Sequence, residues 1–198
     1  MSVLPLQHSQ AASSGHLIFR RAVASDVNSI VALVNSAYRG ESSRAGWTTE
    51  ADILGGQRTD AEEISRLIAE DNSVILLCLR DGEIIGTVHL ERVDAATAYM
   101  GMLVIRPTLQ GRGLGRRFMA EAENFARAEW CSKRMQMKVI TLRHELIAYY
   151  QRRGYRRTGE TGPFPACNPK YGLPKVAGLM FEVLEKPLNR QDRLDSLI

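Results

Sequence analysis

The chain has 198 residues, of which 44% are hydrophobic and 24% are charged, values ordinary for one soluble globular domain with a good core. It holds 26 basic and 22 acidic side chains, a mild excess that suits an anionic ligand and gives no reason to expect a nucleic-acid partner. No run of about 20 apolar residues could span a bilayer, so we expect no membrane segment.

The first third of the chain predicts one strand and two helices. His16 to Arg21 reads as an opening strand. Ser25 offers an N-cap for a helix that Gly40 ends. Apolar residues at helical spacing mark the buried stripe of this helix: Val27, Ile30, Val31, Val34 and Tyr38. After a polar stretch over 41–57, Thr59-Asp-Ala-Glu62 has capping-box spacing and predicts a second helix.

Three strands are predicted next. Ser73 to Arg80 is apolar, and Asp81-Gly82 is a hairpin turn signal that joins it to a partner strand over Glu83 to Val93. Tyr99 to Arg106 is the third strand and leads directly into a glycine-rich segment.

The remaining elements alternate. The helix after the glycine-rich segment carries an apolar stripe at spacings of four, four and three: Leu114, Phe118, Ala122 and Phe125. Arg134 to Leu142 alternates like a strand, and a helix from His144 to Arg153 ends at Gly154. Two strands, Tyr155 to Thr158 and Leu179 to Leu184, close the domain around a loop rich in proline and glycine.

This order predicts an α/β (α+β) fold built on one sheet. We expect a loose polar leader over 1–15 without the features of a signal peptide, a single domain over 16–188, and a peripheral polar tail over 189–198.

Cysteine and histidine suggest neither disulfides nor a metal. Cys78, Cys131 and Cys167 are odd in number and widely spaced, and the four histidines do not complete a zinc pattern with them. We therefore expect no metal and a protein of the reducing cytoplasm.

The glycine-rich segment is the most informative part of the sequence. Gly111, Gly113 and Gly115 lie between an apolar strand and a helix that begins with Arg116 and Arg117. Glycine allows turn angles that other residues resist and lets the backbone lie close to a ligand. Because the first amides of a helix have no partner within it and lie at the positive end of its dipole, this segment suits a phosphate or pyrophosphate.

Three phosphate-binding patterns compete for this segment. No lysine follows the glycines, which disfavours a Walker loop, and the third glycine comes one residue too early for a dinucleotide fingerprint. The pattern Gln/Arg-x-x-Gly-x-Gly/Ala is matched by Gln110, Gly113 and Gly115, after a hydrophobic strand and Pro107. The chain in this way resembles the GNAT-type N-acetyltransferases, from about Phe19 to about Leu184.

The resemblance implies a mixed, twisted central sheet of six to seven strands flanked by about four helices. It also implies acetyl-CoA as the acyl donor, held in two places. The strand before the loop would pair with the pantetheine arm through Met102, Leu103 and Val104. The loop itself would hold the diphosphate through Gln110, Gly111, Arg112, Gly113, Leu114 and Gly115.

The resemblance also nominates catalytic residues. Tyr150 stands four residues before Gly154, as in the Tyr-x-x-x-Gly-Phe/Tyr segment of the family, and would be the general acid for the departing thiolate. A glutamate that many relatives carry on the strand before the loop is absent here. Glu91 on the preceding strand is the predicted base, directly or through water; His89 lies on the same face, and water alone could also carry the proton.

The implied reaction is direct transfer of an acetyl group to the amine of a small molecule within a ternary complex. We expect the acceptor to enter between the 41–57 stretch and the 163–174 loop, with Trp47, Thr48, Glu50 and Phe164 as lining candidates. An aromatic side chain and a carboxylate together would suit an ammonium group. The missing strand carboxylate leaves a non-catalytic acyl-CoA-binding sensor or subunit as the alternative. Homodimers are common in the family, so a homodimer is possible.

Overall fold

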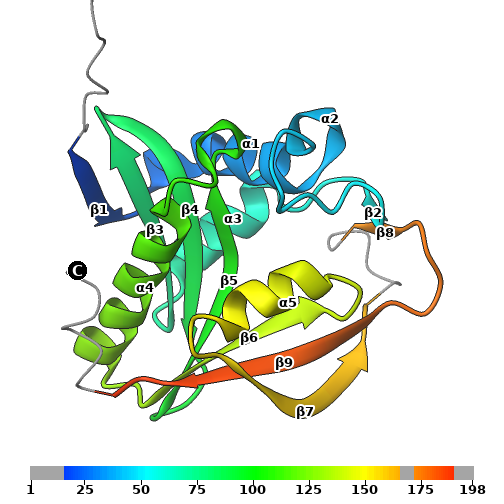
Figure 1. The fold of residues 1–198 in the computed structure, drawn as a ribbon. Coiled ribbons are helices and arrows are strands. Elements are labelled where there is room, and N and C mark those ends of the chain that lie inside the picture. The colour runs from blue at the N-terminus through cyan, green and yellow to red at the C-terminus, as the bar shows by residue number, and fades with distance from the viewer. Residues whose placement is uncertain (1–15, 166–171, 190–198) are drawn as a thin grey trace, which may run out of the picture.

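The computed structural model describes residues 16–165 and 172–189 as a twisted sheet with helices on both faces (Figure 1). The predicted leader and nearly all of the predicted tail lie outside the described residues. The main sheet has the strand order β1-β3-β4-β5-β6-β9-β7. Its strands are β1 (Leu17–Arg21), β3 (Ser73–Arg80), β4 (Glu83–Arg92), β5 (Thr97–Ile105), β6 (Arg134–Ile140), β7 (Arg156–Pro163) and β9 (Met180–Pro187).

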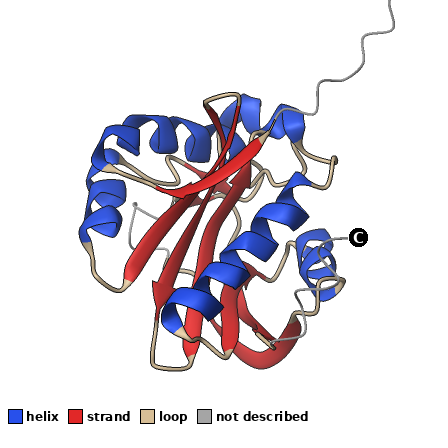
Figure 2. Cartoon of the chain, turned by 90° about the vertical axis from the view of Figure 1, so that its left-hand side faces the viewer, coloured by secondary structure: helices blue, strands red, loops and turns tan. Residues whose placement is uncertain are grey.

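The helices pack against this sheet from two sides, as seen by comparing Figures 1 and 2. They are α1 (Val27–Tyr38), α2 (Gly40–Ser43), α3 (Ala61–Ala69), α4 (Leu114–Trp130) and α5 (His144–Gln151). One hydrophobic core lies between the sheet and α4 with α5, and a second lies between the sheet and α1 with α3. The predicted mixed sheet with helices on both faces is confirmed. No helix in the described part of the chain is long and apolar enough to cross a membrane.

The start of α1 differs from the prediction. A 3₁₀ turn over Ala24–Asp26 precedes the helix, and the Asp26 carboxylate accepts a hydrogen bond from the Val23 amide at 2.9 Å. Arg20 donates to the same carboxylate at 2.6 and 2.9 Å. The prediction that Ser25 caps the helix was wrong: Ser25 lies within the 3₁₀ turn, and Asp26 is the N-cap of α1. The Asp26 carboxylate fixes this turn because it bonds both to Val23 and to Arg20 of β1.

The start of α3 is shifted by one residue from the prediction. Asp60 is the N-cap, and its carboxylate accepts from the Glu63 amide at 2.8 Å. Thr59 instead donates its hydroxyl to the Glu63 carboxylate at 2.8 Å. The capping box predicted over Thr59 to Glu62 is therefore wrong. The N-cap is Asp60, whose carboxylate is the better acceptor of two adjacent capping residues.

The C-terminal strands are longer than predicted, and a small sheet was missed. β7 extends to Pro163, although its side chains are nearly all exposed and show no apolar alternation; its backbone pairs with β9 as an edge strand. The small sheet joins β2 (Leu54–Gly55) to β8 (Leu173–Pro174). Such short strands carry no periodicity that a sequence can reveal.

The sheet opens in its middle, between β5 and β6. These two strands are parallel neighbours, but they pair only where Thr97–Tyr99 meets Arg134–Gln136. Beyond that point β6 pairs with β9 alone. The later half of β5 therefore has a paired neighbour on one side, β4, and diverges from the other.

A bulge occurs in β5 where the strands diverge. His89 of β4 lies opposite Gly101, and the next pair joins Thr87 to Val104. Two residues of β5 thus lie opposite one residue of β4, and the first of them, Met102, has φ of 47°. A side chain with a Cβ rarely takes that conformation, and such strain concentrates at functional sites.

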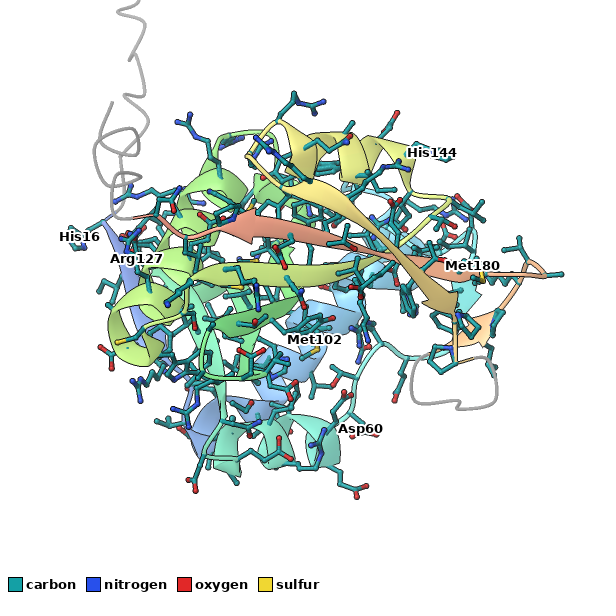
Figure 3. All side chains as sticks on the ribbon, turned by 90° about the horizontal axis from the view of Figure 1, so that it is seen from below. His16, Asp60, Met102, Arg127, His144 and Met180 are labelled. Carbon is teal, nitrogen blue, oxygen red and sulfur yellow. The ribbon has the colours of Figure 1, made fainter. Side chains whose placement is uncertain are left out.

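The bulge reverses the faces of the strand. Met100 packs in the core beneath α4, whereas Met102, two residues later, packs in the core beneath α1 and α3. Met102 lies near the centre of the molecule when it is viewed from below (Figure 3). The bulge is also tied to α1, because the Tyr38 hydroxyl donates to the Leu103 carbonyl at 3.1 Å.

Candidate active site

The glycine loop between β5 and α4 has the geometry of an anion receptor. Gly111 and Gly113 have φ of 78° and 76°, and a Cβ added at either would meet no atom within 4 Å. Both glycines are therefore required by the backbone conformation, and the space beside them is open. Gly113 is the N-cap of α4, so that space lies at the positive end of a 17-residue helix.

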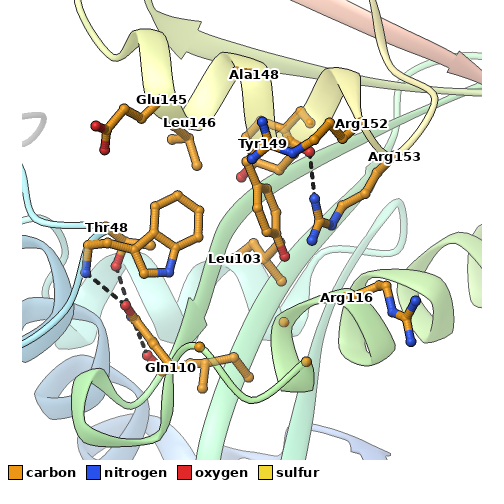
Figure 4. A pocket seen from close by; sticks show the side chains of 16 residues that line it. Thr48, Leu103, Gln110, Arg116, Glu145, Leu146, Ala148, Tyr149, Arg152 and Arg153 are labelled. Carbon is orange, nitrogen blue, oxygen red and sulfur yellow. Dashed lines mark hydrogen bonds between the residues drawn. The ribbon is translucent and has the colours of Figure 1, made fainter.

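A cavity of about 480 Å³ lies beside the loop, between the end of β5 and α5 (Figure 4). It is lined by Trp47, Thr48, Leu103, Ile105, Gln110, Gly111, Gly113, Gly115, Arg116, Glu145, Leu146, Ala148, Tyr149, Tyr150, Arg152 and Arg153. We call it the loop cavity. Three arginines stand against one carboxylate in this lining, so the loop cavity favours an anionic ligand.

Five of the nine predicted cofactor-binding residues line this cavity. They are Leu103, Gln110, Gly111, Gly113 and Gly115. Of the other four, Arg112 is exposed and Leu114 is half-buried in the first turn of α4, whereas Met102 and Val104 are buried in the core beneath α1 and α3. The side chains of Met102 and Val104 thus pack in the core, and only their main chain could reach a ligand.

Gln110 braces the loop cavity through its side chain. Its amide nitrogen donates to the Ile105 carbonyl at 2.9 Å and to the Thr48 hydroxyl at 3.0 Å, and its oxygen accepts from the Trp47 amide at 3.0 Å. These bonds fix the segment after α2 to the end of β5. Gly46 permits the approach, since a Cβ there would lie 2.6 Å from the Gln110 side-chain oxygen.

Tyr149 also lines the loop cavity, which the sequence analysis did not predict. The Arg153 guanidinium lies 3.3 Å from the centre of its ring, and the Trp47 ring packs against it at 4.8 Å (Figure 4). A Cβ at Gly115 would lie 3.1 Å from its hydroxyl, so Tyr149 reaches across to the glycine loop. The sequence placed Tyr149 about 100° around the helix from Tyr150 and so away from the site, yet both tyrosines line the cavity.

Tyr150 occupies the junction of two cavities. It is buried, and it lines both the loop cavity and a second, larger cavity of about 900 Å³. No hydrogen bond joins its hydroxyl to another residue within 16–165 and 172–189. Burial raises the pKa of Tyr150 well above its usual range. The phenol thus stays protonated at any physiological pH.

The larger cavity lies where β5 and β6 diverge, and we call it the sheet cavity. It contains Glu91, the predicted base, together with His89, Glu50 and Phe164. Trp47 and Thr48, predicted to line the acceptor site with them, line the loop cavity instead.

His89 and Glu91 lie at different distances from the bulge. His89 is opposite Gly101, directly beside the bulge, and its Nε2 lies 3.0 Å from the Ser73 hydroxyl. Burial lowers the pKa of His89 to about 4, so the imidazole is neutral at pH 7. Glu91 is half-buried and lies opposite Tyr99. Three residues of strand, about 10 Å, separate Tyr99 from the bulge.

Glu50 is the centre of a buried ion cluster. It pairs with Arg39 and with Arg143, the latter at 3.1 Å, and Arg143 also donates to the Thr48 carbonyl at 2.8 Å. The carboxylate predicted to meet an ammonium group is therefore already paired with two guanidinium groups.

Among the described residues, no group of three or more His, Cys, Asp or Glu side chains could hold a metal ion.

The sheet and its helices match the fold of known acetyltransferases. Residues 29–155 match the acetyltransferase (GNAT) family. None of the curated proteins matches the chain by sequence. Solved structures of similar fold include the YncA protein of Salmonella typhimurium with its cofactor acetyl-CoA. It is 17% identical, covers 88% of this chain and 95% of its own, and has a TM-score of 0.63.

Two further neighbours of similar fold are N-acetyltransferases. The ribosomal-protein-alanine N-acetyltransferase of Brucella melitensis is 17% identical, with 86% of this chain and 99% of that one covered and a TM-score of 0.63. A chimeric spermidine N-acetyltransferase based on the Vibrio cholerae protein is 15% identical, with 87% and 95% covered and a TM-score of 0.61. This chain belongs to the GNAT acetyltransferase family, whose members are acyltransferases.

Proposed function

We propose that this protein transfers an acetyl group from acetyl-CoA directly to the amine of a small molecule while both are bound. The observation that carries the proposal is that the loop cavity and the sheet cavity share Leu103, Leu146 and Tyr150 in their linings. One cavity extends to the phosphate-binding loop, and the other contains the titratable side chains. Two reactants bound in these cavities would meet beside the bulge of β5.

The residues of the loop cavity fit coenzyme A. The open space beside Gly111 and Gly113 suits the diphosphate, and Arg116, Arg152 and Arg153 add positive charge around it. When bound, acetyl-CoA supplies an activated thioester. Leu103 lies where β5 diverges from β6, and its main chain would be available to bind the pantetheine arm of acetyl-CoA.

Positioning is the largest contribution that we assign to this chain. Holding two reactants in adjoining cavities can contribute about 7–11 kcal/mol at best. A main-chain amide of the bulge, near Leu103 or Val104, would stabilise negative charge on the carbonyl oxygen.

Tyr150 is the proposed general acid. Its hydroxyl is protonated at pH 7, and it lies between the two cavities. The proton would go to the departing thiolate as the carbon–sulfur bond breaks.

Glu91 is the proposed base, acting through water. Its side chain lines the sheet cavity but lies too far along β4 to reach the bulge directly. His89 is nearer, but its low pKa makes it a weak acceptor.

The proposal predicts different effects for the two adjacent tyrosines. Tyr150→Phe should lower kcat by about 10² to 10⁴ and leave the affinity for acetyl-CoA unchanged. Tyr149→Phe should keep kcat and change only the KM for acetyl-CoA, because its hydroxyl lies at the glycine loop. The measurement is thiol release from acetyl-CoA with a panel of amino acids, polyamines, aminoglycosides and peptides.

A full rate in Tyr150→Phe would exclude the tyrosine as the acid. Binding of acetyl-CoA by calorimetry without thiol release for any amine would favour the alternative, a non-catalytic acyl-CoA-binding module. The two similar folds named for an alanine of a ribosomal protein and for spermidine show that this fold does not select the acceptor.

A further inference from the structure

The sheet cavity contains a guanidinium group with no carboxylate to balance it. Arg39 and Arg143 pair with Glu50, and Arg66 pairs with Glu70. Arg58 lines the same cavity, and no carboxylate within 16–165 and 172–189 forms an ion pair with it.

Arg58 is held in place through its backbone. Its amide donates to the Asn35 side-chain oxygen at 2.7 Å, and the Asn35 side-chain nitrogen donates to the Thr59 carbonyl at 3.0 Å. Asn35 belongs to α1, so the backbone of Arg58 is held by a packed helix and not by the loop alone. The side chain of Arg58 therefore starts from a fixed point at the edge of the sheet cavity.

The guanidinium lies close to the proposed reaction centre. It sits 5.8 Å from the centre of the Tyr38 ring, and the Tyr38 hydroxyl bonds to the Leu103 carbonyl in the bulge. The positive charge of Arg58 also acts on His89, the residue of β4 beside the bulge. One tyrosine ring thus separates the charge of Arg58 from the strand where the amine would react.

Charges of both signs line the same cavity without an ion pair to another described residue. They are Glu63, Glu91 and Lys138, of which Glu91 is half-buried and Lys138 is exposed. Because Glu50 is already paired with Arg39 and Arg143, it is not a free carboxylate for the ammonium groups of a polyamine. An amine that also carries a carboxylate would meet complementary charge at Arg58.

We propose that Arg58 binds the carboxylate of the acceptor, and that the acceptor is a free amino acid whose amino group is acetylated. This inference rests on the proposed function and adds the class of substrate. The planar guanidinium can hold a carboxylate through two parallel hydrogen bonds, which also orients the molecule.

The test compares amino acids with the amines that lack only the carboxylate, such as phenylalanine with phenethylamine and methionine with 3-(methylthio)propylamine. For the wild type, kcat/KM should be at least about 10-fold higher for an amino acid than for its amine. Arg58→Gln should lower kcat/KM for the amino acid by about 10- to 100-fold, mainly through KM, and leave that for the amine unchanged. Arg58→Lys, which keeps the charge, should recover part of the loss. Arg44→Gln, at an exposed arginine outside both cavities, is the matched control.

The inference would be overturned by equal kcat/KM for the paired compounds, by equal losses for both in Arg58→Gln, or by the absence of any acetylated amino acid. Calorimetry with acetyl-CoA distinguishes a failure of the Arg58 inference from a failure of the proposed function. Acetyl-CoA binding and acetylation of carboxylate-free amines would retain the proposed function and exclude only the role of Arg58. Thermal unfolding of each variant verifies that it is folded.

Discussion

At the scale of single residues, burial has opposite consequences for two titratable groups. A phenol is charged when it loses its proton, so burial keeps Tyr150 protonated and raises its pKa. An imidazole is charged when it gains a proton, so burial keeps His89 neutral and lowers its pKa to about 4. Burial therefore keeps the Tyr150 hydroxyl protonated and the His89 ring neutral.

The low pKa of His89 predicts acid sensitivity. The unfolded chain binds a proton near the ordinary pKa of about 6.5, whereas the folded chain resists it until about pH 4. Stability conferred by His89 is thus complete above pH 6.5 and is lost as the pH falls toward 4, by about 3 kcal/mol in total. Urea unfolding at several pH values would measure this loss.

Two variants define the result for His89. His89→Gln should show a shallower loss of unfolding free energy between pH 6.5 and 4, because its side chain does not titrate. His144→Gln, which removes an exposed imidazole, should behave like the wild type. If His89→Gln and the wild type lost stability in parallel, the buried imidazole would not be the cause.

At the scale of elements, the turn from β5 into α4 combines backbone strain with open space. Gly113 has a left-handed conformation at the helix N-cap, and nothing fills the space beside it. Gly159 in β7 has a similar backbone conformation and similar open space: its φ is 89°, and a Cβ there would also meet no atom within 4 Å. The two glycines differ in what lies beside them, a helix N-terminus or an exposed edge strand.

This pair separates strain from binding. Gly113→Ala and Gly159→Ala should each lower the free energy of unfolding by about 1–2 kcal/mol, the cost of a left-handed residue with a Cβ. Only Gly113→Ala should weaken acetyl-CoA binding, by about 10-fold or more, because its methyl group occupies the space for the phosphate. Calorimetry of both variants measures this. If Gly113→Ala bound acetyl-CoA with unchanged affinity, the glycine loop would not be part of the binding site.

At the scale of the whole molecule, the Glu50 cluster connects three distant parts of the chain. Glu50 lies after α2, Arg39 at the end of α1, and Arg143 just before α5. The cluster also joins the two cavities, because Arg143, which lines the sheet cavity, donates a hydrogen bond to the carbonyl of Thr48, which lines the loop cavity. The cluster thus fixes the two cavities relative to each other.

Glu50→Gln should destabilise the fold strongly. It removes the carboxylate from two buried guanidinium groups, a change that costs about 3–5 kcal/mol and lowers Tm by roughly 10 °C. Glu41→Gln, which breaks an exposed pair with Arg44, should cost less than about 1 kcal/mol. Calorimetric unfolding measures both. Equal Tm values for the two variants would show that burial of the cluster adds nothing.

Much of the fold could be predicted because the relevant signals are local. The apolar stripe of α1, the Asp81-Gly82 turn and the helix after the glycines each depend on neighbouring residues, and the structure confirms these elements. The short β2–β8 sheet and the extended β7 could not be predicted, because their pairing partners are distant in sequence and their side chains carry no apolar alternation.

The sequence by itself determined the family, through the motif around Gln110, Gly113 and Gly115, and the order of the main strands and helices, since spacing and periodicity encode them. Only the tertiary structure decided which side chains share a cavity. It placed Tyr149 and Trp47 beside the glycine loop, Glu50 between two arginines, and Arg58 beside the Tyr38 ring. The physical reason is that a cavity forms where segments far apart in the sequence approach one another, and no periodicity within a single segment records that approach.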